Sequence, residues 1–211
     1  MQLVARFSGR RFRAGLSAGA AVLALALASC AGGLGSLVTK SPPTAYDLAP
    51  AKSFPRHPGH ARGQLVIVEP SALAPLDGSA ILVRPAPGEA AQLANAQWED
   101  RLPKLMQARL LQSFENASRL RTVGRPADKI ATDFVLVTEL RAFEISAADG
   151  SAVAEIAAKI VAEGSGRIIA ARVFRVTVPA SATQGPDAIA ALNEAFVKVA
   201  TELVLWAARV V

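Results

Sequence analysis

Few residues in this 211-residue chain have side chains suited to covalent or metal chemistry. The candidates are a single cysteine, Cys30, two histidines, His57 and His60, and the adjacent carboxylates Glu99 and Asp100. One cysteine cannot close an internal disulfide, and with two histidines it falls short of the usual four-ligand zinc site. Successive helical residues point about 100° apart, so the two carboxylates are better interpreted as helix-dipole residues than as an acid/base pair. We therefore predict no metal site and no catalytic residues.

Cys30 stands at the end of a segment organised like a bacterial signal peptide. Residues 1–29 contain four arginines and no acidic residue before an uninterrupted apolar run, Ala20–Ala28. That run is shorter than the ~20 residues of a membrane-spanning helix, which predicts that the segment is cleaved. The sequence Leu27-Ala28-Ser29-Cys30 resembles the bacterial lipobox, whose cysteine thiolate accepts diacylglycerol and whose new amino terminus accepts an acyl chain. We predict this covalent lipid and no other cofactor.

The net charge has to be read after this leader is removed. The whole chain carries 23 basic and 17 acidic residues, a formal charge of +6, but four of the arginines lie in residues 1–29, which leaves a mature charge of +2. This balance predicts no nucleic-acid partner. Ala31 stands where lipoproteins kept in the inner membrane usually have aspartate, so we expect the periplasmic face of the outer membrane. A secreted protein that merely keeps its cysteine and a twin-arginine signal at Arg10-Arg11 stay open as alternatives.

The mature chain divides into a tether and one domain. We assign residues 1–29 to the signal peptide, 30–45 to the lipidated cysteine and a flexible tether rich in glycine, serine and proline, and 46–211 to an α/β domain. Tyr46 and the next residues are expected to start an edge strand. The short apolar runs Leu65–Val68 and Ile81–Val83 indicate strands buried on both faces, so helices should cover both sides of the sheet.

Longer periodic segments follow. Apolar residues at three- and four-residue spacings predict a helix from Trp98 to about Leu120. Three segments bounded by glycine turns, Phe134–Ile145, Ala152–Val161 and Ile168–Val178, predict an antiparallel meander. A second apolar stripe predicts a closing helix over Asp187–Ala208, which should lie on the sheet, although the stripe could also serve self-association in a homo-oligomer. The fold class is therefore α/β, a mixed sheet with helices packed on it.

Several short motifs occur in an order that resembles the ABC-type transport auxiliary lipoproteins, the family that includes the paraquat-inducible lipoprotein partner of MCE-domain lipid transporters. The resemblance spans about Tyr46 to Trp206. Its most specific element is Trp98-x-x-x-Leu102-Pro103, which we assign a structural role. The other matching motifs are the lipobox at Cys30, Tyr46-Asp47-Leu48, Leu76-Asp77-Gly78, Ile81-Leu82-Val83-Arg84, Asp133-Phe134-Val135-Leu136, Glu139-Leu140-Arg141-Ala142-Phe143-Glu144 and Arg172-Val173-Phe174.

The resemblance implies a layered α/β sandwich like the amino-terminal domain of the translocation protein TolB. It also implies a non-enzymatic function, in which the lipoprotein docks an inner-membrane ATPase, a permease and an MCE-domain protein to the outer membrane. Phospholipid or a related hydrophobic solute would then cross the periplasm through this assembly.

Two other functions stay open. The protein could itself carry lipid in a cavity between sheet and helices, lined by apolar residues around Phe134, Phe143, Phe174 and Phe196, although aromatic residues at such spacings are more often core. A periplasmic hydrolase is the weaker alternative, because the sequence has no Gly-x-Ser-x-Gly elbow, phosphate-binding loop or dinucleotide fingerprint.

Overall fold

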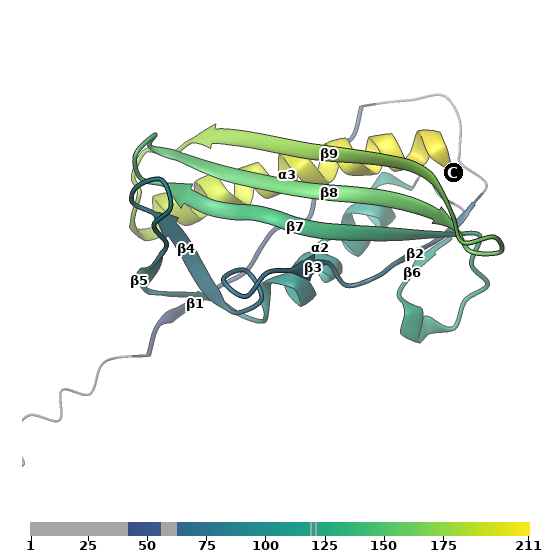
Figure 1. Ribbon diagram of the computed structural model, residues 1–211, viewed down its shortest axis with the longest axis horizontal. Coiled ribbons are helices and arrows are strands. Elements are labelled where there is room, and N and C mark those ends of the chain that lie inside the picture. The colour runs from purple at the N-terminus through teal and green to yellow at the C-terminus, as the bar shows by residue number, and fades with distance from the viewer. Residues whose placement is uncertain (1–41, 56–62, 119, 121) are drawn as a thin grey trace, which may run out of the picture. The chain divides into compact units, whose positions relative to one another are not determined.

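The computed structural model describes residues 42–55, 63–118, 120 and 122–211. Its central strands form where apolar residues alternate between glycine turns: β7 (Phe134–Ser146), β8 (Ser151–Ala162) and β9 (Arg167–Pro179) pair antiparallel in chain order (Figure 1). Gly150 and Gly166 have φ values of 60° and 65° in the two hairpin turns, a conformation that glycine adopts without steric cost. The predicted antiparallel meander is therefore confirmed.

Shorter strands continue the sheet from the other edge of β7. The two short apolar runs form β2 (Gln64–Ile67) and β4 (Ala80–Arg84), and both run parallel to β7. Between them β3 (Ser71–Ala72) pairs with β7 as well. The remaining pairs are β6 (Thr122–Gly124) with β2, β5 (Ala91–Trp98) with β4, and β1 (Thr44–Tyr46) with β5. The described residues thus form one nine-stranded mixed sheet, with β1 on an edge as expected.

Helix α3 (Gly185–Val210) closes the described fold and buries its apolar stripe. Pro186 lies in the first turn, where its missing N–H breaks no hydrogen bond, and Asp187 stands at the positive end of the helix dipole. The buried stripe residues are Ile189, Leu192, Phe196, Val199 and Leu203. Because the sheet covers this stripe, it is not available as a seam for self-association.

Helix α2 (Leu102–Ala117) starts later than predicted. Trp98 is the last residue of β5, a strand that the sequence did not predict, so its assignment to the helix was wrong. Pro103 explains the difference, because its ring would clash with the carbonyl four residues earlier and therefore fits only in the first turn. Glu99 and Asp100 consequently precede the helix, and its first turn holds no acidic residue.

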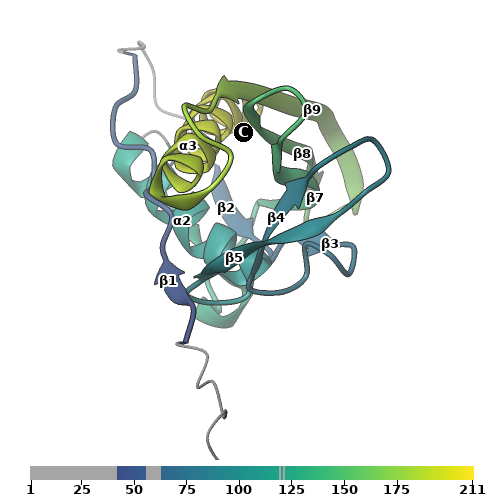
Figure 2. The ribbon, with the colours of Figure 1, turned by 90° about the vertical axis from the view of Figure 1, so that its left-hand side faces the viewer.

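Both helices pack on the same face of the curled sheet, as Figure 2 shows, and contribute to one hydrophobic core. The expectation that helices cover both faces is therefore wrong. The outer sides of the short strands are covered by irregular segments instead: Leu82 lies beside the β3–β4 connection, and Val66 beside the segment of the 3₁₀ helix η1 (Pro126–Asp128). The prediction that β2 and β4 are buried on both faces is correct. A strand in an α/β fold can be covered on one face by irregular segments, so this burial does not require a helix on each face.

Candidate functional site

The predicted lipidation residues, Leu27, Ala28, Ser29 and Cys30, lie outside the residues that the structure describes. The same holds for His57 and His60. Their assignments stay predictions from the sequence. Among the described residues, no three His, Cys, Asp or Glu side chains are grouped as a metal site would require.

The most specific family motif, Trp98, Leu102 and Pro103, lies in the core. Trp98 and Leu102 are each 1% exposed, and Pro103 is buried at the start of α2. The Trp98 ring centroid lies 5.6 Å from that of Phe143 on β7, and Phe143 in turn makes an edge contact with Phe196 on α3. The motif thus joins the end of β5, the start of α2, the sheet and α3.

Arg101, inside this motif, fixes the connection between β3 and β4. Its Nε donates to Asp77 at 2.9 Å, and a terminal nitrogen donates to Glu69 at 2.5 Å. These two carboxylates raise the pKa of Arg101 from its ordinary value, with the hydrogen bond to Asp77 contributing most. Two motifs that are far apart in the sequence, Leu76-Asp77-Gly78 and Trp98 to Pro103, are therefore held together.

A second arginine joins the first strand to α2. Arg109 forms an ion pair with Asp47, which follows β1, and a weaker one with Glu99 at 3.3 Å. The Arg109 side chain is 17% exposed, less than any other arginine in these ion pairs, while Asp47 is 44% exposed. It explains why the Tyr46-Asp47-Leu48 motif accompanies the α2 motif.

The third pair lies on the sheet itself. Arg84 at the end of β4 makes two hydrogen bonds of 2.7 Å to the two carboxylate oxygens of Glu144 on β7. The Glu144 side chain is only 13% exposed. The hydrogen bond and the charge of Glu144 raise the pKa of Arg84 above its ordinary value, so the guanidinium stays charged. Both residues belong to motifs identified in the sequence, but the sequence did not predict that they form an ion pair.

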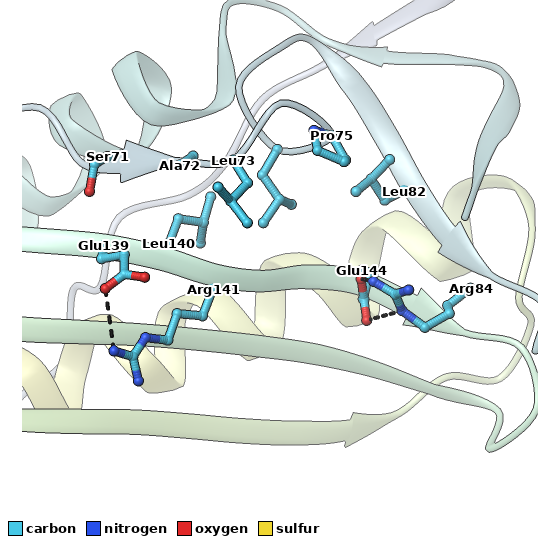
Figure 3. A pocket seen from close by; sticks show the side chains of 11 residues that line it. Ser71, Ala72, Leu73, Pro75, Leu82, Arg84, Glu139, Leu140, Arg141 and Glu144 are labelled. Carbon is cyan, nitrogen blue, oxygen red and sulfur yellow. Dashed lines mark hydrogen bonds and ion pairs between the residues drawn. The ribbon is translucent and has the colours of Figure 1, made fainter. Parts of the chain in front are cut away.

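A pocket of about 460 Å³ opens beside this pair, where the sheet splits. On the edge of β7 opposite β8, β3 pairs up to Leu140 and β4 pairs from Glu144 onward, so the residues between them have no strand partner on that side. The β7–β8 register also shifts between Leu140 and Ala142, as in a β-bulge, which bends a strand locally. The β3–β4 connection bridges the split, and Figure 3 shows the pocket between the connection and the strands.

The pocket wall is mainly aliphatic and its charges are matched. Its residues are Ser71, Ala72, Leu73, Pro75, Leu76, Leu82, Arg84, Glu139, Leu140, Arg141 and Glu144. At the rim, Arg141 lies 3.3 Å from Glu139, so each arginine has a carboxylate partner. The lining contains no histidine and no cysteine, and its one hydroxyl, on Ser71, donates to the Thr138 carbonyl at 3.4 Å. A cavity of this size with aliphatic walls suits binding an apolar group, and both of its carboxylates are held by arginines.

The sequence left open a lipid-binding cavity between the sheet and the helices. That region is separate from the pocket at the split, and core side chains fill it. Phe143, Phe174 and Phe196 are at most 1% exposed and are packed in the core, and Phe134 is partly buried against it. The sequence did not predict the pocket at the split, because β3 has only two residues and the pocket depends on where β3 ends and β4 begins. The available signal was Leu73 and Leu76 in the segment between β3 and β4, together with Leu82 on β4.

The mixed α/β fold carries an aliphatic pocket at the split of its sheet. The chain belongs to the ABC-type transport auxiliary lipoprotein component family, which matches residues 46–204. The resemblance drawn from the motifs is thereby confirmed. The family is one of auxiliary lipoproteins of ABC-type transport, and such lipoproteins are associated with the cell envelope.

Other proteins of known sequence or structure are similar to this chain. The uncharacterized protein bll6063 of Bradyrhizobium diazoefficiens is 33% identical over 163 residues, which are 76% of this chain and 44% of that protein. The chain thus spans less than half the length of this curated relative. Protein XCC0632 of Xanthomonas campestris has a crystal structure with a TM-score of 0.71 and 30% identity, covering 79% of this chain and 96% of that one. The hypothetical protein CT253 of Chlamydia trachomatis, at 8% identity and a TM-score of 0.50, shares the fold over 71% of this chain and 98% of its own.

No helix among the described residues is both long and apolar enough to span a bilayer.

Proposed function

We propose that this protein is the docking component of an ABC-type transport system that includes an MCE-domain protein. In this proposal the diacylglycerol and acyl chain on Cys30 hold it at the periplasmic face of the outer membrane, and residues 31–43 provide reach. The α/β domain binds the MCE-domain protein, which is joined to a permease and an ATPase in the inner membrane. The system moves phospholipid or another hydrophobic solute between the two membranes, and the auxiliary protein itself catalyses no reaction.

The family match over residues 46–204 carries this proposal, and the architecture supports it. Three ion-paired arginines, Arg84, Arg101 and Arg109, join segments distant in the sequence, so the domain presents a largely preformed surface. Preformed surfaces lose less conformational entropy when they bind a partner. Both carboxylates of the pocket lining, Glu139 and Glu144, are paired with arginines, which fits a docking role better than a hydrolase.

Co-isolation from native envelopes tests the docking role. The full-length chain with a carboxyl-terminal affinity tag is cross-linked in cells and isolated, and the captured proteins are quantified by mass spectrometry. We expect an ABC ATPase, a permease and an MCE-domain protein to be enriched together. The matched control is a tagged, unrelated lipoprotein with the same signal peptide and tether. Enrichment equal to that control for all three proteins would contradict the proposal.

The pocket at the split favours one second candidate, a carrier that holds lipid itself. Its volume of about 460 Å³ and its leucine-rich wall would accept a flexible aliphatic chain. In that case Leu82→Arg, which places a long charged side chain on the pocket wall, should remove bound phospholipid from the isolated protein. The same change at Val137, which is exposed on β7 outside the pocket, should leave it bound.

A further inference from the structure

β9 leaves a long strand edge open. It pairs with β8 along one side from Arg167 to Pro179, and no other strand of the described residues pairs with it (Figure 1). On such an edge, alternate N–H and C=O groups point away from the sheet and can pair with another extended chain. A 13-residue edge is long enough for a complete added strand.

The sheet face beside this edge carries several exposed apolar side chains. Ile168, Ile169 and Val173 on β9 are 57%, 47% and 49% exposed, and Val137 on β7 is 39% exposed. In the β8–β9 register, Val173 is opposite Ala157 and Ile168 is opposite Val161, and between these two pairs Ala171 is opposite the exposed Lys159. The opposite face packs on α3. The open face of a one-sided antiparallel sheet is normally polar, and exposed apolar side chains on it are a feature of interaction surfaces.

The charges on β9 indicate what kind of chain could pair there. The strand carries Arg167, Arg172 and Arg175 and no acidic residue. Arg175 lies 2.5 Å from Glu155 on β8, and the Arg172 guanidinium lies 4.9 Å from the centre of the Phe174 ring. A second copy of β9 would bring more arginines to the same edge, and like charges facing each other across strands are destabilising. A chain with acidic residues would instead be attracted.

We propose that β9 is a docking edge for an extended, acidic and apolar segment of a partner protein, which adds to the sheet as a tenth strand. Main-chain hydrogen bonds to the edge supply much of the affinity. Valine-like side chains of the segment extend the apolar face of Val173 and Ile168, and its carboxylates approach the arginines. The inference rests on the docking role proposed above, and it assigns that role to a particular strand.

A synthetic peptide tests the edge directly. The lipidated full-length protein in phosphatidylcholine nanodiscs is titrated with a fluorescent eight-residue peptide of alternating valine and glutamate, and binding is followed by anisotropy. We expect saturable binding that weakens as salt is raised. A lysine-for-glutamate peptide should bind at least about tenfold more weakly. A peptide N-methylated at every residue, which has no backbone N–H to donate from either edge, should not bind.

Protein variants locate the binding on β9. Val173→Glu and Arg167→Glu should each weaken the acidic peptide about tenfold or more. Ala190→Glu and Lys198→Glu, on the exposed side of α3, make matching changes away from the edge and should leave binding unchanged. The N-methylated peptide keeps the test valid even where a β9 variant folds poorly, because it uses the unaltered protein.

Each contrary outcome overturns a definite part of the proposal. Failure of the acidic peptide to bind would mean that the arginines only protect the edge from aggregation. Equal binding of the N-methylated peptide would exclude strand addition. Sedimentation that shows oligomers of the wild type, dissociated by Val173→Glu, would assign the edge to a second copy. If the peptide binds but the transporter proteins are not co-isolated, the docking role is wrong and the assignment of β9 as a binding edge is kept. If the transporter proteins are co-isolated equally well with Val173→Glu, the docking role is kept and the assignment to β9 is wrong.

Discussion

At the scale of single residues, the described part of the core contains one buried side-chain oxygen without a hydrogen-bond partner. Thr138 on β7 is 1% exposed, and its hydroxyl has no hydrogen-bond partner among the described residues. A buried unsatisfied hydroxyl costs about 1–3 kcal/mol. We expect Thr138→Val, which keeps the shape, to leave the free energy of unfolding unchanged or raise it by about 1 kcal/mol. Urea denaturation measures this, and a loss of stability would show that the hydroxyl has a partner, such as ordered water.

Asp100 provides a prediction about pH. Lys104, one helical turn later, donates a hydrogen bond that lowers the pKa of the Asp100 carboxyl below its ordinary value, and the Arg101 N–H adds to this. Because the pKa is lower in the folded state, the stabilisation is complete above the unfolded value of about 4 and is lost as the pH falls through the folded value. Lys104→Met should raise the pKa of Asp100, as NMR titration of the carboxyl carbon can show. An unchanged pKa in this variant would contradict the assignment to Lys104.

At the scale of elements, the sequence predicted what depends on local pattern. The three meander strands and the closing helix were found, because alternation and the 3.6-residue stripe are long and uninterrupted in Phe134–Ile145 and Asp187–Ala208. β5 was missed because its residues, Ala91–Trp98, are mostly alanine, glutamine and asparagine, and Asn95 has a positive φ of 55°. The pocket and the ion pairs could not be predicted, since they depend on the strand register between distant segments.

Trp98 gives the element-scale prediction. Its indole is 1% exposed and joins β5 to β7 and α2, so Trp98→Ala should lower the free energy of unfolding by about 3–5 kcal/mol. Trp206 provides the matched control: it is only partly buried and touches Phe174 from the side of α3. Trp206→Ala should cost clearly less in the same urea titration. Equal losses for the two variants would show that Trp98 does not have the joining role described here.

At the scale of the whole molecule, we propose that a lipid anchor on Cys30 determines where the domain acts. We expect Cys30→Ser to move the protein from the membrane fraction to the soluble periplasmic fraction, because two or more acyl chains are needed for stable anchoring. Sucrose-gradient fractionation of envelopes measures this and also tests the outer-membrane placement of the wild type. Retention in membranes of Cys30→Ser from which the signal peptide has been removed, as intact mass shows, would contradict lipidation as the anchor. Wild type in the inner-membrane fraction would contradict the placement.

We propose that the α/β domain docks a transporter and does not itself carry the transported lipid. Mass spectrometry of lipids that co-purify with the secreted Cys30→Ala chain, isolated without detergent, distinguishes these two roles. We predict far less than one phospholipid per protein, because the predicted cavity among the core phenylalanines is filled and the pocket at the split, of about 460 Å³, is lined by charged as well as aliphatic side chains. One phospholipid per protein, lost in Leu82→Arg, would contradict the docking account and establish a carrier.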